Sequence, residues 1–321
     1  RVLRLSWEER PAVEPAQPEA STSAWTFENV ADDRGLDFVH GAFETGLSED
    51  PAAMMGGGLC WLDYDADGWL DLYVVNSHAL AEVDYWDAQG GLPHNELFRN
   101  VEGNFQRAGD DTGAAIAHRG NGCVAADFDG DGATDLFITA DGPNIMLRNR
   151  GDGTFEDVSA ESGTDSPEWN TAAVVGDLNS DSRPELYVGS YIDLDLKIDK
   201  PSGAFPQDFI GLPDRLFANL SSPGSIRFEE ITGAAGLDRD ERGLGGLLSD
   251  FDLDGDLDLY IANDGQPNRL YRNDSPGDGV TVTMSDVTDE AGVGDSGSGM
   301  GVAGGDYDQN GALDILITNW E

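Results

Sequence analysis

The sequence predicts an all-β protein, a β-propeller built from four-stranded antiparallel blades, and three observations indicate this fold. A nine-residue acidic motif occurs five times, and every copy is flanked by the same kinds of β-favouring segment. Glycine is abundant, at 42 of 321 residues, while helical periodicity is scarce. Because repeated units bury their apolar faces only by stacking on one another, this repetition is the main guide to the architecture.

The acidic motif places Asp, Asn or Glu at positions 1, 3, 5 and 9, usually with Gly at position 6. Apolar runs follow the five copies directly: LYVV, LFIT, LYVG, LYIA and ILIT. Carboxylates on alternate residues of a tight turn repel one another unless a hard cation lies between them. The motif residues are Asp63, Asp65, Asp67, Asp71, Asp127, Asp129, Asp131, Asp135, Asp177, Asn179, Asp181, Glu185, Asp250, Asp252, Asp254, Asp258, Asp306, Asp308, Asn310 and Asp314.

The donor set of these loops favours Ca²⁺, with about five sites. Side chains at positions 1, 3 and 5 converge, Gly at 6 permits the turn, and the carboxylate at 9 closes an all-oxygen shell that suits Ca²⁺ better than Mg²⁺. Zn²⁺ and copper are disfavoured because no Cys or His lies in the loops. An EF-hand is excluded because position 12 is apolar and the flanking segments are β-like. The third loop is predicted to bind most weakly, since Asn179 lowers its charge, Ser182 replaces Gly and Glu185 replaces Asp.

Four segments recur in each unit. A glycine-rich strand such as GNGCVAA (120–126) precedes the loop, and the apolar run leaves it. An Asn-bounded segment such as NIMLRN (144–149) and a strand with a turn such as TFEDVSAESG (154–163) follow. Radial stacking of such sheets makes a propeller with the glycine-rich strand innermost. We therefore expect a propeller domain over residues 24–321.

The two ends of the chain depart from this repeat. Segment 26–36 has the pattern of a fourth strand before any first strand, so we expect it to complete the last blade. The sequence stops after the second strand of the fifth unit, which leads us to expect a longer parent protein. Residues 1–23 are rich in Pro, Ala and Glu and predict an extended arm, in which RVLRLSW has the alternation of a short edge strand.

Charge and cysteine content exclude several classes of partner. With 62 Asp and Glu against 18 Lys and Arg, the formal charge is −44, which argues against nucleic acid or an anionic membrane surface. No apolar run approaches the ~20 residues of a membrane span. Cys60 and Cys123 precede successive loops, and we expect two buried thiols, with a disulfide between neighbouring repeats as the alternative.

Taken together, DYDADGWLDLYVVN, DFDGDGATDLFITA, DFDLDGDLDLYIAN, NRLYRN and TFEDVSAESG resemble the FG-GAP/VCBS repeat family, and within it the cartilage acidic protein-like group. The family shares its calcium-loop blade with the integrin α-subunit head. The resemblance covers about residues 26–321 and implies a propeller, commonly of seven blades, with structural Ca²⁺ and an extracellular, cell-surface or periplasmic setting. Ser182 and the lack of the last blades depart from the family pattern.

Two long connections between second and third strands, residues 76–94 and 190–213, are the places where function is expected, since recognition residues gather on loops of rigid scaffolds. They carry aromatic and His side chains that could contact a partner or pack on their own blade. These candidates are His78, Tyr85, Trp86, His94, Tyr191, Phe205 and Phe209.

No Ser/His/Asp pattern, phosphate loop or Cys/His cluster is present in the sequence. We therefore expect a non-catalytic scaffold that binds a protein or a surface polymer, and a role as one subunit of an assembly fits the same expectation. The alternatives are a carbohydrate-active enzyme, a lyase or dehydratase, and a lectin, either of which would use the same two connections.

Overall fold

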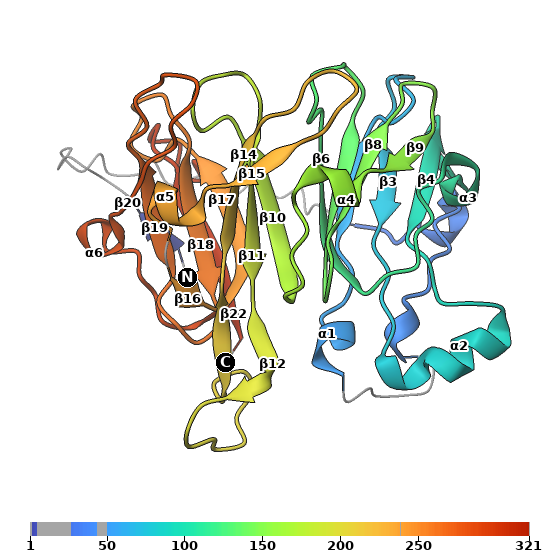
Figure 1. The fold of residues 1–321 in the computed structure, drawn as a ribbon, viewed down its shortest axis with the longest axis horizontal. Helices are drawn as coiled ribbons and strands as arrows, with labels where there is room; N and C mark the ends of the chain where they lie inside the picture. Colours follow the sequence, from blue (N-terminus) through green and yellow to red (C-terminus); the bar gives the residue numbers. More distant parts are fainter. Residues whose placement is uncertain (1, 5–26, 44–49, 238, 321) are drawn as a thin grey trace.

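The computed structural model describes residues 2–4, 27–43, 50–237 and 239–320, and it is built mainly of antiparallel sheets (Figure 1). The predicted arm over residues 1–23 lies outside the described residues except for 2–4. Four sheets contain four strands each. The first sheet is β2 (Leu59–Leu62), β3 (Asp71–Val74), β4 (Glu96–Val101) and β5 (Asn104–Arg107). The second is β6 (Gly120–Ala126), β7 (Asp135–Ala140), β8 (Ile145–Asn149) and β9 (Phe155–Asp157).

The remaining sheets repeat this order. The third is β10 (Asn170–Gly176), β11 (Glu185–Ser190), β14 (Arg215–Asn219) and β15 (Phe228–Glu230). The fourth is β17 (Gly243–Ser249), β18 (Asp258–Asn263), β19 (Arg269–Asn273) and β20 (Met284–Asp286). The fifth is β21 (Ser298–Gly305), β22 (Asp314–Trp320) and β1 (Val2–Arg4). A small sheet of β12 (Ile192–Lys197), β13 (Phe209–Pro213) and β16 (Asp240–Glu241) is inserted in the third unit.

The sheets pack face to face in chain order. Their first strands are neighbours in the series β2, β6, β10, β17 and β21. Four apolar clusters fill the spaces between consecutive sheets, each with residues from both sides, such as Tyr73 with Leu136 and Tyr260 with Ile315. Because a sheet covers each face, all residues of β7, β11 and β18 are buried. The prediction of stacked four-stranded units is therefore confirmed for the first four units.

The helices are short and most of them follow a fourth strand. These are α3 (Gly109–Thr112), α4 (Ser159–Ser162), α5 (Thr232–Ala235) and α6 (Thr288–Ala291). The others are α1 (Pro51–Met54), α2 (Val83–Gln89) and the 3₁₀ turns η1 (Asp32–Arg34), η2 (Gly41–Phe43) and η3 (Leu80–Glu82). Within the described part of the chain, no helix has the length and apolar character needed to span a membrane.

A left-handed glycine ends three of these helices and fits each of them against the next sheet. A Cβ on Gly113, Gly163 or Gly236 would lie 3.1, 2.6 or 2.7 Å from a carbonyl oxygen of that sheet's fourth strand. The same positions have φ between 78° and 93°. Only glycine satisfies both the close approach and the backbone angle. Each of the first three units is thus held against its successor through main-chain contact.

Residues 27–36 do not pair with the fifth sheet, and the expectation that segment 26–36 completes the last blade of a longer protein stays a prediction. Its described residues 27–36 contain η1 and no strand, and they lie along β5 of the first sheet. The Arg34 guanidinium donates to the Gly103 carbonyl at 3.5 Å, and Gly35 closely approaches the Phe105 carbonyl. The segment therefore takes the place beside the first sheet that α3, α4 and α5 take beside later sheets. The free edge of β22 pairs instead with β1, in the register Val2↔Leu316.

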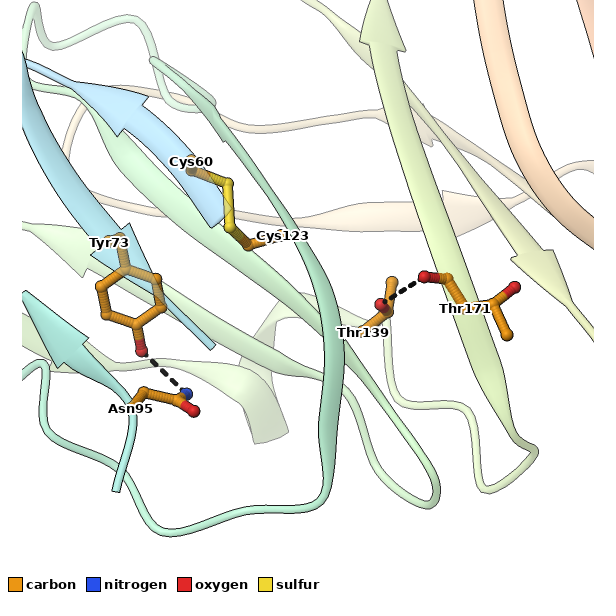
Figure 2. The surroundings of a disulfide bond; sticks show 6 residues. All are labelled: Cys60, Tyr73, Asn95, Cys123, Thr139 and Thr171. Atoms are coloured by element: carbon orange, nitrogen blue, oxygen red, sulfur yellow. Dashed lines mark hydrogen bonds between the residues drawn. A yellow bond between two sulfur atoms is a disulfide. The ribbon is translucent and has the colours of Figure 1, made fainter. Parts of the chain in front are cut away.

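Cys60 and Cys123 form a disulfide, which corrects the expectation of two buried thiols (Figure 2). The S–S distance is 2.03 Å, and the bond joins β2 to β6, the first strands of neighbouring sheets. The next pair of sheets is joined without cysteine, by a hydrogen bond of 3.3 Å from the Thr139 hydroxyl to the Thr171 carbonyl. Equivalent strands approach closely enough for a covalent link because the sheets are packed on small side chains.

Replacing both cysteines, Cys60→Ala with Cys123→Ala, is expected to lower the free energy of unfolding by about 4 kcal/mol, because the bond closes a loop of 63 residues in the unfolded chain. Denaturant unfolding with and without reductant measures the change. Reduction should shift the midpoint of the parent protein and leave the double variant unaffected. An unshifted midpoint for the parent would contradict the prediction.

Candidate metal sites and the insertion face

Each acidic loop is closed by the carboxylate at position 1. In the second loop, Asp127 accepts backbone N–H groups of Asp131 at 3.1 Å and Gly132 at 2.9 Å. Asp63, Asp177, Asp250 and Asp306 accept the equivalent pairs in the other loops. These bonds hold positions 3 and 5 on the same side of the turn as position 1. The five loops therefore share one backbone conformation.

Position 6 of every loop has a left-handed backbone angle, which explains the glycine there. Gly68, Gly132, Gly255 and Gly311 have φ between 85° and 106°. Ser182 adopts φ 68° in the third loop, where a side chain makes this conformation unfavourable. The third loop is thus strained at the position where the sequence departs from the repeat.

Four loops bring together carboxylate oxygens in groups that could hold a metal ion. In each group, three ligand atoms lie within 4.8 Å of one another. The groups are Asp63, Asp65 and Asp71; Asp127, Asp129 and Asp135; Asp250, Asp252 and Asp254; and Asp306, Asp308 and Asp314. Among the described residues, the third loop contributes no such group of acids. Its Asn179 side chain instead donates to Glu185 at 3.1 Å.

Two position-3 oxygens support the fit of a cation. Oδ1 of Asp65 and Oδ1 of Asp252 are buried and accept no hydrogen bond from any residue that the structure describes. A buried, unsatisfied carboxylate oxygen is costly, and a cation would remove that cost. The donors around it are all oxygens, which suits a hard divalent ion.

The position-9 carboxyl is the most buried part of each loop. Asp71 accepts the N–H of Asn100 at 2.7 Å and of Tyr64 at 3.1 Å, and the second, third and fourth units repeat this pair of bonds. Burial is the main cause that raises the pKa of Asp71 and Asp258 to about 6 and that of Asp135 and Glu185 to about 7. Since a carboxylate has about four lone-pair sites, two remain for a metal.

A third-strand asparagine connects each loop to the preceding one, and the sequence motif alone did not reveal this role. The side-chain NH₂ of Asn149 donates to the Tyr64 carbonyl at 2.8 Å, which is position 2 of the preceding loop. Asn219 and Asn273 make the same bond to their preceding loops, both at 3.0 Å. The recurring Asn at the end of NIMLRN and NRLYRN is the signal that could have indicated it.

An arginine also lies at the first loop. The Arg99 guanidinium is 2.8 Å from Asp65 and 3.1 Å from Asp67, so it neutralises part of the charge beside the acid group. It belongs to β4 of the same sheet.

The two long connections fold into α2 and into the β12–β13 hairpin, and both stand at the end of the molecule opposite to the acidic loops (Figure 1). We call this end, built by residues 76–94 and 190–213, the insertion face. Second strands run away from the acidic loops, and the insertions begin where these strands end. The two connections therefore project on the same side.

The candidate contact residues divide by burial. His78 and Tyr191 are buried, so they are not surface contacts, and burial lowers the pKa of His78. Tyr85 is 36% and Phe205 is 46% exposed. The remaining candidates are Trp86 and Phe209, which are half-buried, and His94, which is exposed.

Each connection borders its own pocket. Trp86 and His94 line one of about 570 Å³ beside the first sheet. Tyr191 and Phe205 line another of about 680 Å³. The structure does not bring the seven residues together into one site.

Comparison with known proteins agrees with the repeat. The model of the FG-GAP-like repeat matches residues 63–138, 127–188 and 250–317, which together cover more than half of the chain. Human cartilage acidic protein 1 is 28% identical over 201 residues, which is 59% of this chain and 26% of the relative. The Xenopus tropicalis protein is 26% identical over 213 residues, covering 63% of this chain and 29% of the relative. The chain is distantly homologous to these proteins and spans about a quarter of their length.

Solved structures show weaker likeness. The V. cholerae biofilm matrix protein Bap1 aligns with a TM-score of 0.39 and 11% identity, covering 82% of this chain and 34% of Bap1. The exotype rhamnogalacturonan lyase YesX aligns with a TM-score of 0.36 and 16% identity, covering 71% and 47%. The repeat match, the acidic loops and the recurring sheets agree on one classification: the chain belongs to the FG-GAP-like repeat family.

Proposed function

We propose that the protein is a calcium-stiffened, non-catalytic β-propeller scaffold that acts outside the cytoplasm and binds a protein or surface polymer on its insertion face. The observation that carries this proposal is the separation of two regions. The acidic loops lie at one end of the sheets, whereas α2 and the β12–β13 hairpin extend from the other. Rigid loops at one end and elaborated connections at the other are typical of a binding scaffold.

Calcium is the ion that the loops favour. The acid groups offer only oxygens, each loop carries a high negative charge, and position-9 carboxylates are buried where a compensating cation is most effective. Five loops share the backbone conformation, and the third has the weakest donor set. We expect the ion at the third loop to bind more weakly than the ions at the other four loops.

The propeller interpretation rests on the way in which the sheets succeed one another. Each first strand contacts the next first strand, and the faces at the two ends of the row remain partly uncovered. Trp61 of the first sheet is 51% and Leu316 of the fifth is 50% exposed. These are the faces that neighbouring blades cover in a ring.

An extracellular or periplasmic location is supported by the disulfide, because such bonds persist in oxidising compartments. The relationship to cartilage acidic protein 1 is consistent with this. The excess of acid, with a net charge of −44, favours partners that are neutral or basic.

Removal of calcium is expected to lower the melting temperature by several degrees, because a ligand at one hundred times its Kd stabilises the folded state by about 2.7 kcal/mol per site. Thermal scans with EDTA, and with Ca²⁺ or Mg²⁺ restored, measure the effect. Ca²⁺ should restore stability better than Mg²⁺. An identical melting temperature with and without chelator would contradict the proposal.

Ser182→Gly is expected to stabilise the protein by about 1 kcal/mol, because glycine adopts φ 68° without the strain that a side chain adds. The matched control is Gly132→Ser in the second loop, where φ is 91° and a Cβ would meet no atom within 4 Å. The control should be destabilising by a similar amount. Denaturant midpoints in excess Ca²⁺ measure both, and equal signs for the two variants would refute the explanation.

Partner binding is tested with arrays of glycans and extracellular proteins. A double variant, Tyr85→Ala with Phe205→Ala, should lose the signals that the parent protein gives, because it removes two exposed aromatic anchors from the insertion face. The control is Leu220→Ala, which removes a 49% exposed apolar side chain beyond the end of β14. Turnover of a glycan by the parent protein would contradict the non-catalytic role. An equal loss of array signal in the double variant and in Leu220→Ala would contradict binding on the insertion face.

A further inference from the structure

A pocket of about 680 Å³ opens on the insertion face where the first strands of four sheets begin. Asn121, Thr171, Leu244 and Met300 contribute from β6, β10, β17 and β21. The end of β22 and the residues around α1 complete the wall, and Figure 1 shows α1, β12 and the C-terminal end at this side of the molecule. The pocket is thus built at the centre of the repeat, where neighbouring first strands meet.

One carboxylate in this wall has an unsatisfied oxygen. Asp264 follows β18 and is 3% exposed. Its Oδ2 accepts the Tyr191 hydroxyl at 2.6 Å, while its Oδ1 is buried and accepts no hydrogen bond from any described residue. An ionised oxygen in this state is unfavourable until a donor reaches it. Asp264 is also the only charged residue among those that line the pocket.

Arg242 is bonded to Asp264 through the main chain, where its carbonyl accepts the Asp264 N–H at 2.9 Å, but its side chain does not supply that donor. The Arg242 guanidinium donates to the backbone carbonyls of Gln207 and Phe209, at 3.3 and 3.0 Å. It therefore supports the loop that carries Phe205 and makes no hydrogen bond to Oδ1 of Asp264.

Beside the polar side chains of Asn121, Thr171, Gln207 and Ser298, the pocket has an apolar and aromatic part. Phe205 contacts Tyr191 with a ring-centroid distance of 6.2 Å, and Met54, Met300 and Trp320 line the space around them. Aromatic ring faces attract cations, and apolar side chains such as those of Met54 and Met300 make van der Waals contact with an alkyl chain. A carboxylate ligand would be repelled by Asp264 and by the acidic surface of the protein.

The wall is held in place by a half-buried ion pair. Arg119 donates to Asp50 at 2.7 and 2.9 Å, and to Asp141 at 3.0 Å. Asp50 is the N-cap of α1, so this pair fixes the helix that presents Met54 to the pocket.

We propose that this pocket binds a primary ammonium group on an apolar stem: the ammonium donates to Oδ1 of Asp264, and the stem lies against Tyr191 and Phe205. A lysine side chain of a polypeptide and a free alkylamine share this chemistry. Binding of a lysine side chain from a partner polypeptide rests on the proposed scaffold function. Binding of a free alkylamine does not, so it tests the pocket by itself.

The experiment uses three probes on the calcium-loaded protein, with binding followed by calorimetry. N-acetyl-lysine methylamide is compared with the norleucine analogue, which has the stem without the ammonium, and with trimethyl-lysine, which keeps the charge but donates no hydrogen bond. n-Butylamine represents the free source. The lysine probe and butylamine should bind, the norleucine analogue should not, and trimethyl-lysine should bind about tenfold or more weakly than lysine.

Variants assign the site. Asp264→Asn should weaken lysine binding by about tenfold or more, and Asp195→Asn, an exposed acid on β12 outside the pocket, controls for the loss of one charge. Phe205→Ala should also weaken binding, and its exposed position makes it tolerant of replacement.

The outcomes separate this inference from the proposed function. Equal binding of the lysine and norleucine probes, binding of neither, or equal effects of Asp264→Asn and Asp195→Asn would overturn the pocket assignment. Amine binding without any partner on the protein and glycan arrays would support the pocket and reject the scaffold function. If the parent protein binds an array partner, the Tyr85 and Phe205 double variant loses it and no amine binds, the scaffold function is supported and the pocket assignment is rejected.

Discussion

A buried carboxyl at the start of each second strand is the interaction on which the rest of the repeat depends. In the first four units it accepts one N–H from its own acidic loop and one from the asparagine that ends the third strand. The loop, the second strand and the third strand are therefore joined at a single side chain. Because burial opposes its ionisation, this group favours a neighbouring cation, and the metal loop and the sheet stabilise each other.

The same asparagine extends this link between units. Asn149, Asn219 and Asn273 each donate to the preceding loop, so that the second, third and fourth sheets are each connected to the acidic loop before them. Left-handed glycines at the helix ends add main-chain contact from one sheet to the next. Apolar clusters supply the bulk of the packing, while these polar contacts set the relative position of the sheets.

The local features of the fold could be predicted from sequence because they depend on neighbouring residues. The acidic loops, the strands on both sides of them and the weak third loop follow from motif spacing and from Ser182. Long-range pairing could not be predicted in this way. RVLRLSW has the alternation of a short edge strand, but nothing in the sequence indicates that β1 pairs with β22.

Side-chain environments were equally hard to predict. The positions of Cys60 and Cys123 on equivalent strands are compatible with two thiols or with a disulfide. The distance between the two sheets decides which of these forms, and the sequence does not give that distance. His78 and Tyr191 lie in connections that read as exposed, but the connections fold into α2 and the β12–β13 hairpin and bury them. Asp264 belongs to no motif at all, and its position in a pocket depends on four separate sheets.

The glycine contacts between sheets also bear on how such a chain can lengthen or shorten. The ends of α3, α4 and α5 each meet the equivalent carbonyl of the following fourth strand, so the first three junctions share one backbone contact. Duplication or loss of a whole unit would preserve this contact, whereas a cut within a unit would separate a glycine from its carbonyl. We therefore expect whole units to be gained or lost most readily at the junctions marked by Gly113, Gly163 and Gly236.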